Sequence, residues 1–152
     1  MIELAFYQPE IPQNLGAAMR LSACMGVKMH IIEPCGFPFN ARKIRQSAMD
    51  YIQHVDYQRH SSWAAFQDFT QGRRIILMTT KSNVPYYNHE FVAGDILLAG
   101  QESAGVPPAV HEAASARVTI PMAGAARSLN IINATAMILG EGLRQCGKTV
   151  NL

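Results

Sequence analysis

Residues 120–133 read Ile120-Pro121-Met122-Ala123-Gly124-Ala125-Ala126-Arg127-Ser128-Leu129-Asn130-Ile131-Ile132-Asn133, and a mostly apolar segment continues to Arg144-Gln145. This is the order expected of a strand end, a small pliable loop and a helix start. A loop of glycine and alanine lets a ligand approach the backbone closely. Ser128 or Asn130 can cap the helix, whose first N–H groups then face the same loop. The stretch therefore favours an α/β protein with a small-molecule site at this loop.

Strand and helix signals alternate along the rest of the chain. We expect strands at residues 2–7, 27–32, 52–57, 74–79, 95–99 and 118–120. We expect helices at residues 15–25, 42–50 and 129–146, a short one opened by Pro107 or Pro108 and continuing through Ala114, and another that begins after Ser61 or Ser62 and continues through Phe69. Asn14 is a candidate cap for the first helix, and Gly26 a candidate residue to end it. The alternation predicts an α/β fold with a mostly parallel sheet and helices on both faces.

Composition describes a compact globular protein. The chain has 152 residues, which fits one domain, with 49% hydrophobic and 16% charged residues. Its 13 basic and 11 acidic residues leave a net charge of +2, too small to indicate nucleic-acid binding by itself. Any basic surface would have to come from local clustering.

Cysteine usage and the N-terminus bear on location. The three cysteines show no CxxC spacing and no His/Cys cluster, so disulfides and a metal site are disfavoured and a reducing cytoplasm is favoured. The first residues lack the basic region and cleavage site of a signal peptide. No apolar run reaches the roughly 18 residues of a membrane span. We therefore expect a cytoplasmic protein without metal or membrane contact.

A second segment with two glycines around a carboxylate follows an expected buried strand. It reads Gly100-Gln101-Glu102-Ser103-Ala104-Gly105-Val106-Pro107. In a parallel sheet it would lie beside Thr79-Thr80 and Pro121-Met122, because ligands and loops meet at the carboxyl ends of the strands. An ordinary turn fits the pattern equally well. The segment is neither GxGxxG nor GxxxxGK[ST], which disfavours NAD and ATP.

The first helix carries a charge among apolar neighbours. Arg20 lies between Met19 and Leu21, about two turns after Asn14. A buried arginine there would need a partner, whereas a snorkelling one would reach solvent. The position alone leaves both interpretations open.

Together these segments resemble the motifs of the SPOUT-class RNA 2′-O-ribose methyltransferases, especially the small single-domain enzymes that methylate the tRNA wobble nucleotide. The matching segments are residues 7–16 with Arg20-Leu21, residues 100–107, and residues 120–122 with 127–130 and 141–145, with further similarity at 30–34, 50–51 and 79–81. The resemblance covers essentially the whole chain. It implies one SPOUT domain over residues 1–152, with a deep C-terminal trefoil knot formed by about residues 75–145.

The resemblance also implies a cofactor and a reaction. The cofactor would be S-adenosyl-L-methionine, and the reaction 2′-O-methylation of the ribose at C34 or U34 of tRNA. The implied cofactor-binding residues are Met78, Thr79, Gly100, Glu102, Gly105, Ile120, Met122, Ser128 and Leu129. The implied catalytic residues are Arg20, Asn14, Ser128 and Asn130. Because an arginine stays protonated and is a poor base, we expect Arg20 to orient the hydroxyl or a phosphate. Either the same chain or a partner subunit could supply this arginine.

The family pattern further implies a homodimer that binds the tRNA anticodon loop, a single-stranded target whose bases can be splayed out. The first and last helices would form the dimer interface. Apolar residues suited to that interface, or equally to the core, are Met19, Cys24, Ile138, Leu139 and Leu143. The candidate phosphate contacts, each of which could instead be a solvated surface charge, are Arg42, Lys43, Arg45, Lys81 and Arg127.

Four positions depart from the family pattern. The second motif usually carries an arginine where Ala104 stands, and the third usually carries a serine where Ile132 stands. Gly140 replaces a common tyrosine and Ala17 a common asparagine. These departures keep two alternatives open: the same chemistry on another tRNA position or on rRNA, or a non-catalytic knotted RNA-binding protein.

Overall fold

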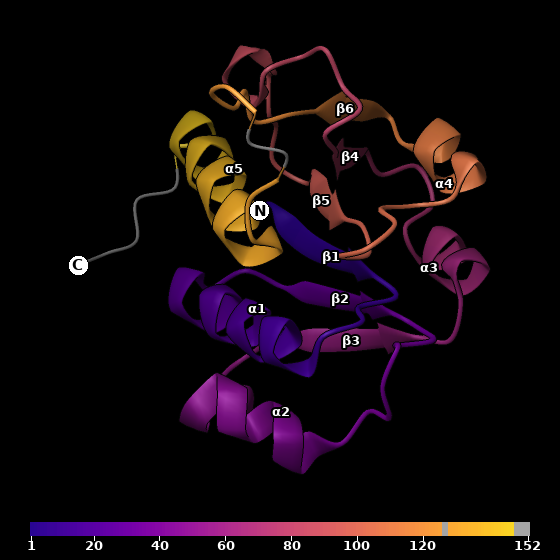
Figure 1. Cartoon of the computed structure of the whole chain (residues 1–152), viewed down its shortest axis with the longest axis vertical. Helices are drawn as coiled ribbons and strands as arrows, with labels where there is room; N and C mark the ends of the chain where they lie inside the picture. The colour runs from indigo at the N-terminus through magenta and orange to yellow at the C-terminus, as the bar shows by residue number, and fades with distance from the viewer. Residues whose placement is uncertain (126–127, 148–152) are drawn as a thin grey trace.

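The computed structural model describes residues 1–125 and 128–147 (Figure 1). Within them, six strands form one sheet in the order β3-β2-β1-β5-β4-β6, and every neighbouring pair is parallel. The strands are β1 (Glu3–Tyr7), β2 (Met29–Ile32), β3 (Tyr57–His60), β4 (Ile75–Met78), β5 (Ile96–Ala99) and β6 (Ala116–Val118). The predicted α/β class is confirmed. The threading of the segment expected to form the knot stays a prediction.

Helices cover both faces of the sheet. In Figure 1, α1 (Pro12–Met25), α2 (Ala41–Ala48) and α5 (Ile131–Gln145) lie on one side, and α3 (Trp63–Phe69) and α4 (Pro108–Ala113) on the other. Two short 3-10 helices, η1 (Met49–Gln53) and η2 (Tyr86–Asn88), complete the described elements. None of the helices described is long and apolar enough to cross a membrane.

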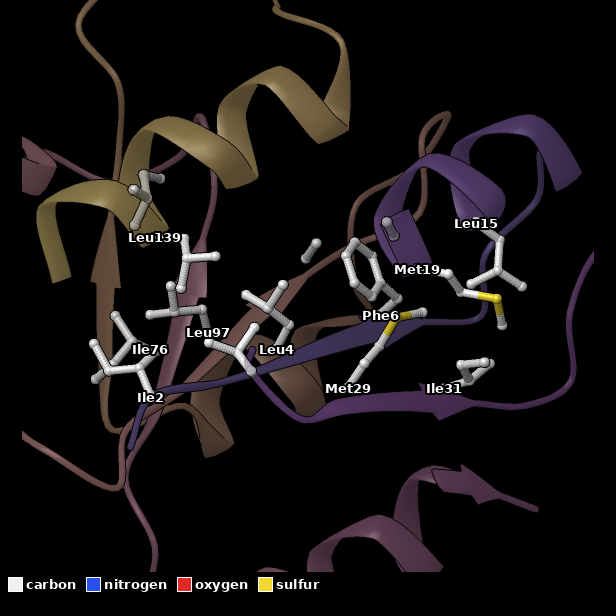
Figure 2. Close-up of a cluster of buried hydrophobic side chains, with 14 of the residues drawn as sticks. Ile2, Leu4, Phe6, Leu15, Met19, Met29, Ile31, Ile76, Leu97 and Leu139 are labelled. Atoms are coloured by element: carbon white, nitrogen blue, oxygen red, sulfur yellow. The ribbon is translucent and has the colours of Figure 1, made fainter. Parts of the chain in front are cut away.

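The larger core lies between the sheet and the helices α1, α2 and α5. Leu4 and Phe6 of β1 point into it, beneath Leu15 and Met19 of α1 and Leu139 of α5 (Figure 2). The alternate residues of β1 face a second cluster beneath α3 and α4. Strands buried on both faces read as continuous apolar runs, which is why β1, β4 and β5 were correctly predicted.

The core settles an alternative left open by the sequence. Met19, Ile138, Leu139 and Leu143 are buried within a single chain, at 0 to 4% exposure, so they are core residues. Burying each such side chain contributes about 1.5–3 kcal/mol. Cys24 is instead exposed on α1.

Of the two caps predicted for the first helix, the structure contradicts one and confirms the other. Helix α1 begins at Pro12, and its N-cap is Ile11, whose side chain makes no cap hydrogen bond. The expected cap at Asn14 is therefore wrong: proline suits the first helical position, so the helix starts three residues earlier than expected. At the other end Gly26 adopts φ 60°, which confirms the predicted left-handed C-cap.

The remaining caps follow the alternatives that the sequence offered. Ser62 accepts a hydrogen bond from the Ala65 N–H at 3.1 Å and caps α3, and Pro108 opens α4. For α5 the cap is Asn130, whose Oδ1 accepts from the N–H groups of Ile132 and Asn133 at 2.9 and 3.3 Å. Helix α5 therefore begins at Ile131, two residues after the expected start.

Two predicted strands are misplaced. The strand expected at residues 52–57 is wrong, because η1 occupies residues 49–53 and β3 begins at Tyr57, which pairs with Met29. Ile52 and Val55 reach the core from non-strand backbone, and their apolar character misled the prediction. Strand β6 ends at Val118, whereas the prediction began there, because its ladder with β4 begins at Ala116.

Candidate functional site

A cavity of about 950 Å³ lies at the carboxyl ends of β4, β5 and β6, beside the start of α5. This volume lies within the range of small-molecule and cofactor sites. The predicted site residues that line it are Asn14, Met78, Thr79, Lys81, Gly100, Glu102, Gly105, Ile120, Met122, Ser128, Leu129 and Asn130. The strand order reverses between β1 and β5, whose connections leave toward opposite edges of the sheet, and Asn14 after β1 and the turn after β5 both contribute to the cavity lining.

The turn after β5 forms one wall of this cavity. Its base is closed by two backbone hydrogen bonds, from the Gln101 N–H to the Gly105 carbonyl at 2.7 Å and from the Gly105 N–H to the Gln101 carbonyl at 3.0 Å. A Cβ on Gly100 would lie 2.7 Å from the Gly105 carbonyl carbon, and Gly105 has φ +64°. Both glycines are therefore required by the backbone of the turn.

Glu102 joins the three sequence motifs. Its Oε2 accepts from the Glu10 N–H at 3.0 Å and its Oε1 from Asn14 Nδ2 at 3.3 Å. Asn14 Oδ1 in turn accepts from Asn130 Nδ2 at 3.2 Å. The amide that fails to cap α1 thus connects the turn after β5 to the cap of α5. Both carboxylate oxygens of Glu102 are engaged by the protein, so its charge is held in a defined place.

Arg20 does not reach the cavity of its own chain. It is exposed, lies outside the cavity lining, and its guanidinium carbon is 5.4 Å from the centre of the Tyr51 ring. Arg20 shares the exposed face of α1 with Gln13 and Cys24. Of the two interpretations left open, the structure selects the solvent-facing arginine.

The candidate RNA-binding residues occupy two places. Lys81 is exposed and lines the cavity next to Thr79. Arg42 and Lys43 are exposed on α2, apart from the cavity lining. The side chain of Arg45 and the residue Arg127 lie outside the described part of the chain.

Two site residues were missed by the sequence reasoning. The Glu10 carboxylate accepts from the Ser103 backbone N–H at 3.1 Å and from Ser103 Oγ at 2.7 Å. These hydrogen bonds from Ser103 hold the pKa of Glu10 below its usual value. Both residues belong to segments quoted as motifs, but no spacing rule relates positions that lie 93 residues apart.

The thiol of Cys35 is not a candidate nucleophile. Burial, with the charges of Glu33 and Glu102, raises the pKa of Cys35 to about 11. The thiol therefore stays protonated at neutral pH, and protonated thiols are poor nucleophiles. Within residues 1–125 and 128–147, no group of three or more His, Cys, Asp or Glu side chains could hold a metal ion.

The positions that depart from the family pattern have distinct surroundings. Ala104 is exposed in the cavity wall, whereas Ile132 is half-buried and packs against the core. Gly140 is exposed on α5, and a Cβ at this position would have no neighbour within 4 Å, so a larger side chain would fit there. Only Ala104 changes the lining of the cavity.

Known proteins resemble this chain over nearly its whole length. The family described as SpoU rRNA Methylase matches residues 1–140. The chain is 53% identical over 146 residues to a tRNA (cytidine(34)-2′-O)-methyltransferase of Beijerinckia indica subsp. indica, covering 95% of this chain and 91% of that protein.

Solved structures resemble it as well. One, described as giving structural insights into the 2-OH methylation of C/U34 on tRNA, has a TM-score of 0.90 and 38% identity, with 95% of each chain covered. Another is the SpoU methyltransferase AviRb from Streptomyces viridochromogenes in complex with the cofactor AdoMet. It has a TM-score of 0.85 and 25% identity, covering 95% of this chain and 60% of that one.

Proposed function

Because the chain belongs to the SpoU rRNA Methylase family, we propose that it transfers a methyl group from S-adenosylmethionine to a ribose 2′-hydroxyl of tRNA, at the wobble nucleotide C34 or U34. The observation that carries the proposal is the hydrogen-bonded connection of Asn14, Glu102 and Asn130 at the cavity. It unites one polar residue from each of the three motifs. The relatives named for C34 or C/U34 methylation support the choice of nucleotide.

The cavity residues suit S-adenosylmethionine. Apolar side chains of Met78, Ile120 and Met122 line the cavity together with the glycine-bearing turn, where backbone groups are accessible. The carboxylate of Glu102 puts a negative charge in the wall, which favours a positively charged donor. When bound, S-adenosylmethionine supplies a methyl group activated on a sulfonium.

The chain's own contribution is orientation. Asn14 is held by Glu102 and by Asn130, and Asn130 is held by Asn14 and by the start of α5, so their positions do not depend on a ligand. Groups that are already ordered hold a reactant at a smaller entropic cost. Ser128 lines the same cavity and is exposed, so its hydroxyl is available to the ribose.

Arg20 then acts in the cavity of a second subunit. In this arrangement the exposed faces of α1 and α5 form a homodimer interface, and Arg20 of each chain orients the 2′-hydroxyl or a phosphate at the other chain's cavity. Support comes from the exposed position of Arg20 and from the exposed apolar residues Ala136 and Met137 on α5. The anticodon loop would meet Lys81 at the cavity and Arg42 and Lys43 on α2.

The proposed location is the cytoplasm. Cys24, Cys35 and Cys146 are all free thiols, which fits a reducing compartment, and that compartment holds the proposed tRNA substrate.

The test is methylation of total tRNA by the purified protein with methyl-labelled S-adenosylmethionine, followed by nucleoside mapping. We expect label on the 2′-oxygen of nucleotide 34. Label at another tRNA position, or only on rRNA, would retain the chemistry and overturn the choice of nucleotide. Absence of cofactor binding in calorimetry would instead favour the non-catalytic alternative.

A further inference from the structure

The loop between β1 and α1 and the turn after β5 exchange hydrogen bonds in both directions. The Glu10 N–H donates to Glu102 Oε2 at 3.0 Å. In return, the Ser103 N–H donates to Glu10 Oε1 at 3.1 Å, and Ser103 Oγ lies 2.7 and 2.9 Å from the two oxygens of the Glu10 carboxylate. Two consecutive residues of the turn are thus held by the backbone and the side chain of one glutamate.

The tip of this turn has few other attachments. Its base is closed by the paired backbone bonds of Gln101 and Gly105. In the described part of the chain, the hydrogen bonds that reach residues 102–104 come from Glu10 and Asn14. Glu10 is the one that contacts the backbone of the tip. The place of Glu102 in the cavity wall therefore depends on Glu10 together with Asn14, and that of the Ser103 backbone depends on Glu10.

The backbone of Glu10 is itself held in place by the segment around Gly36. The Gly36 N–H donates to the Pro9 carbonyl at 2.9 Å, and a Cβ on Gly36 would lie 3.1 Å from the Glu10 Cα. Gln8 adopts φ 43°, a conformation uncommon for a non-glycine residue and typical of functional loops. The loop thus presents both the N–H and the carboxylate of Glu10 to the turn.

We propose that Glu10 is a positioning residue, which holds the 101–105 turn and its Glu102 carboxylate in the geometry that binds the methyl donor. This proposal rests on the proposed function. Glu10 lies outside the cavity lining, so it acts through the turn and not by contact with substrate. Removal of its carboxylate should weaken donor binding more than the rate of the bound complex.

The experiment compares Glu10→Ala, Glu10→Gln and the matched control Glu112→Ala, which removes an exposed carboxylate of α4 outside the cavity lining. We expect Glu10→Ala to raise the Kd for S-adenosylmethionine about tenfold, the equivalent of about 1.4 kcal/mol. It should also raise the KM for S-adenosylmethionine with little change in kcat. Glu10→Gln should restore most of the affinity, because its amide can accept from the Ser103 N–H and donate to Ser103 Oγ. Glu112→Ala should match the wild type.

A second measurement needs no ligand. Hydrogen exchange at the Gly105 N–H reports opening of the turn, because this group bonds to Gln101 and not to Glu10. We expect Glu10→Ala to accelerate exchange there while exchange in β1 and β5 is unchanged. Unchanged exchange at Gly105, or a Kd within twofold of the wild type, would overturn the proposal. Accelerated exchange across the whole sheet would also overturn it, because Glu10 would then only support the fold.

The two proposals fail in distinguishable ways. A wild-type protein that neither binds S-adenosylmethionine nor methylates tRNA would overturn the proposed function, and with it the donor-binding role of Glu10. The exchange comparison would still decide whether Glu10 holds the turn.

Discussion

Asn14 lies in the first turn of α1, where its amide bonds to Glu102 and to Asn130 instead of capping the helix. Asparagine is one of the residue types preferred at the N-cap of a helix, so an asparagine near an expected helix start predicts a cap. Its actual partners come from segments 88 and 116 residues away. At the residue scale, the chemistry of the site depends on such contacts more than on residue type.

Arg20 is the residue on which the proposed reaction depends most. We expect Arg20→Ala to lower the rate of methyl transfer by at least about 10²-fold, the size of effect that follows loss of a positioned catalytic group. Calorimetry should still show S-adenosylmethionine binding. Arg59→Ala is the matched control, because Arg59 is also exposed and lies over an aromatic ring, 4.0 Å from the centre of Phe39. Retained turnover in Arg20→Ala would exclude the role.

Two buried histidines predict acid sensitivity of the fold. His30 Nδ1 lies 2.9 Å from His60 Nε2, and His30 Nε2 lies 2.7 Å from Glu3 Oε2. Burial lowers the pKa of His30, although Glu3 opposes the shift, and burial with the charge of His30 lowers the pKa of His60. This geometry fits two neutral imidazole rings, because a single N–H hydrogen lies between His30 Nδ1 and His60 Nε2.

The direction of these pKa shifts determines how the stability of the fold changes with pH. The unfolded histidines, with ordinary pKa values near 6.5, take up protons before the folded ones, so stability is full above pH 6.5 and falls as the pH drops below it. We expect the free energy of unfolding to decrease between pH 7.5 and 5.5. His60→Gln, which keeps an amide beside His30 without titrating, should flatten this dependence, whereas exposed His54→Gln should not. Equal slopes in all three proteins would contradict the assignment.

At the scale of elements, the start of α5 serves two purposes through one side chain. Asn130 Oδ1 caps the helix, and Asn130 Nδ2 donates to Asn14. Loss of an N-cap costs about 1 kcal/mol, whereas loss of the bond to Asn14 affects the cavity wall. Two variants can separate these effects.

We expect Asn130→Ala to lower both stability, by about 1 kcal/mol, and methyl transfer. Asn130→Asp keeps an oxygen for the cap and suits the helix N-terminus, but it cannot donate to Asn14. Its stability in denaturant should therefore stay near that of the wild type while turnover falls. If Asn130→Asp kept full activity, the bond to Asn14 would be unimportant for catalysis.

At the scale of the whole molecule, Arg20 does not line the cavity of its own chain. The proposed homodimer would bring the two together. We expect Met137→Glu, on the exposed face of α5, to shift the protein toward monomer in analytical ultracentrifugation and to reduce turnover. Val84→Glu is the control, because Met137 and Val84 are each 42% exposed. A monomeric wild type, or equal effects of the two variants, would contradict this interface.

The sequence by itself determined the fold class, most strands and the segments that form the cavity. Buried parallel strands such as β4 and β5 are continuous apolar runs, and glycine is required where Gly100 and Gly105 approach each other. These are local signals, readable from neighbouring residues. The resemblance to a family extended them to a cofactor and a reaction.

Only the tertiary structure decided which polar groups meet. Edge strand β3 begins where β2 offers a partner to Tyr57, so its apolar content could not locate it. The bond from Glu10 to Glu102 spans 92 residues and arises because β1 and β5 are neighbours in the sheet. Strand order is a property of the packed chain, and for this reason the contacts at the strand ends required the structure.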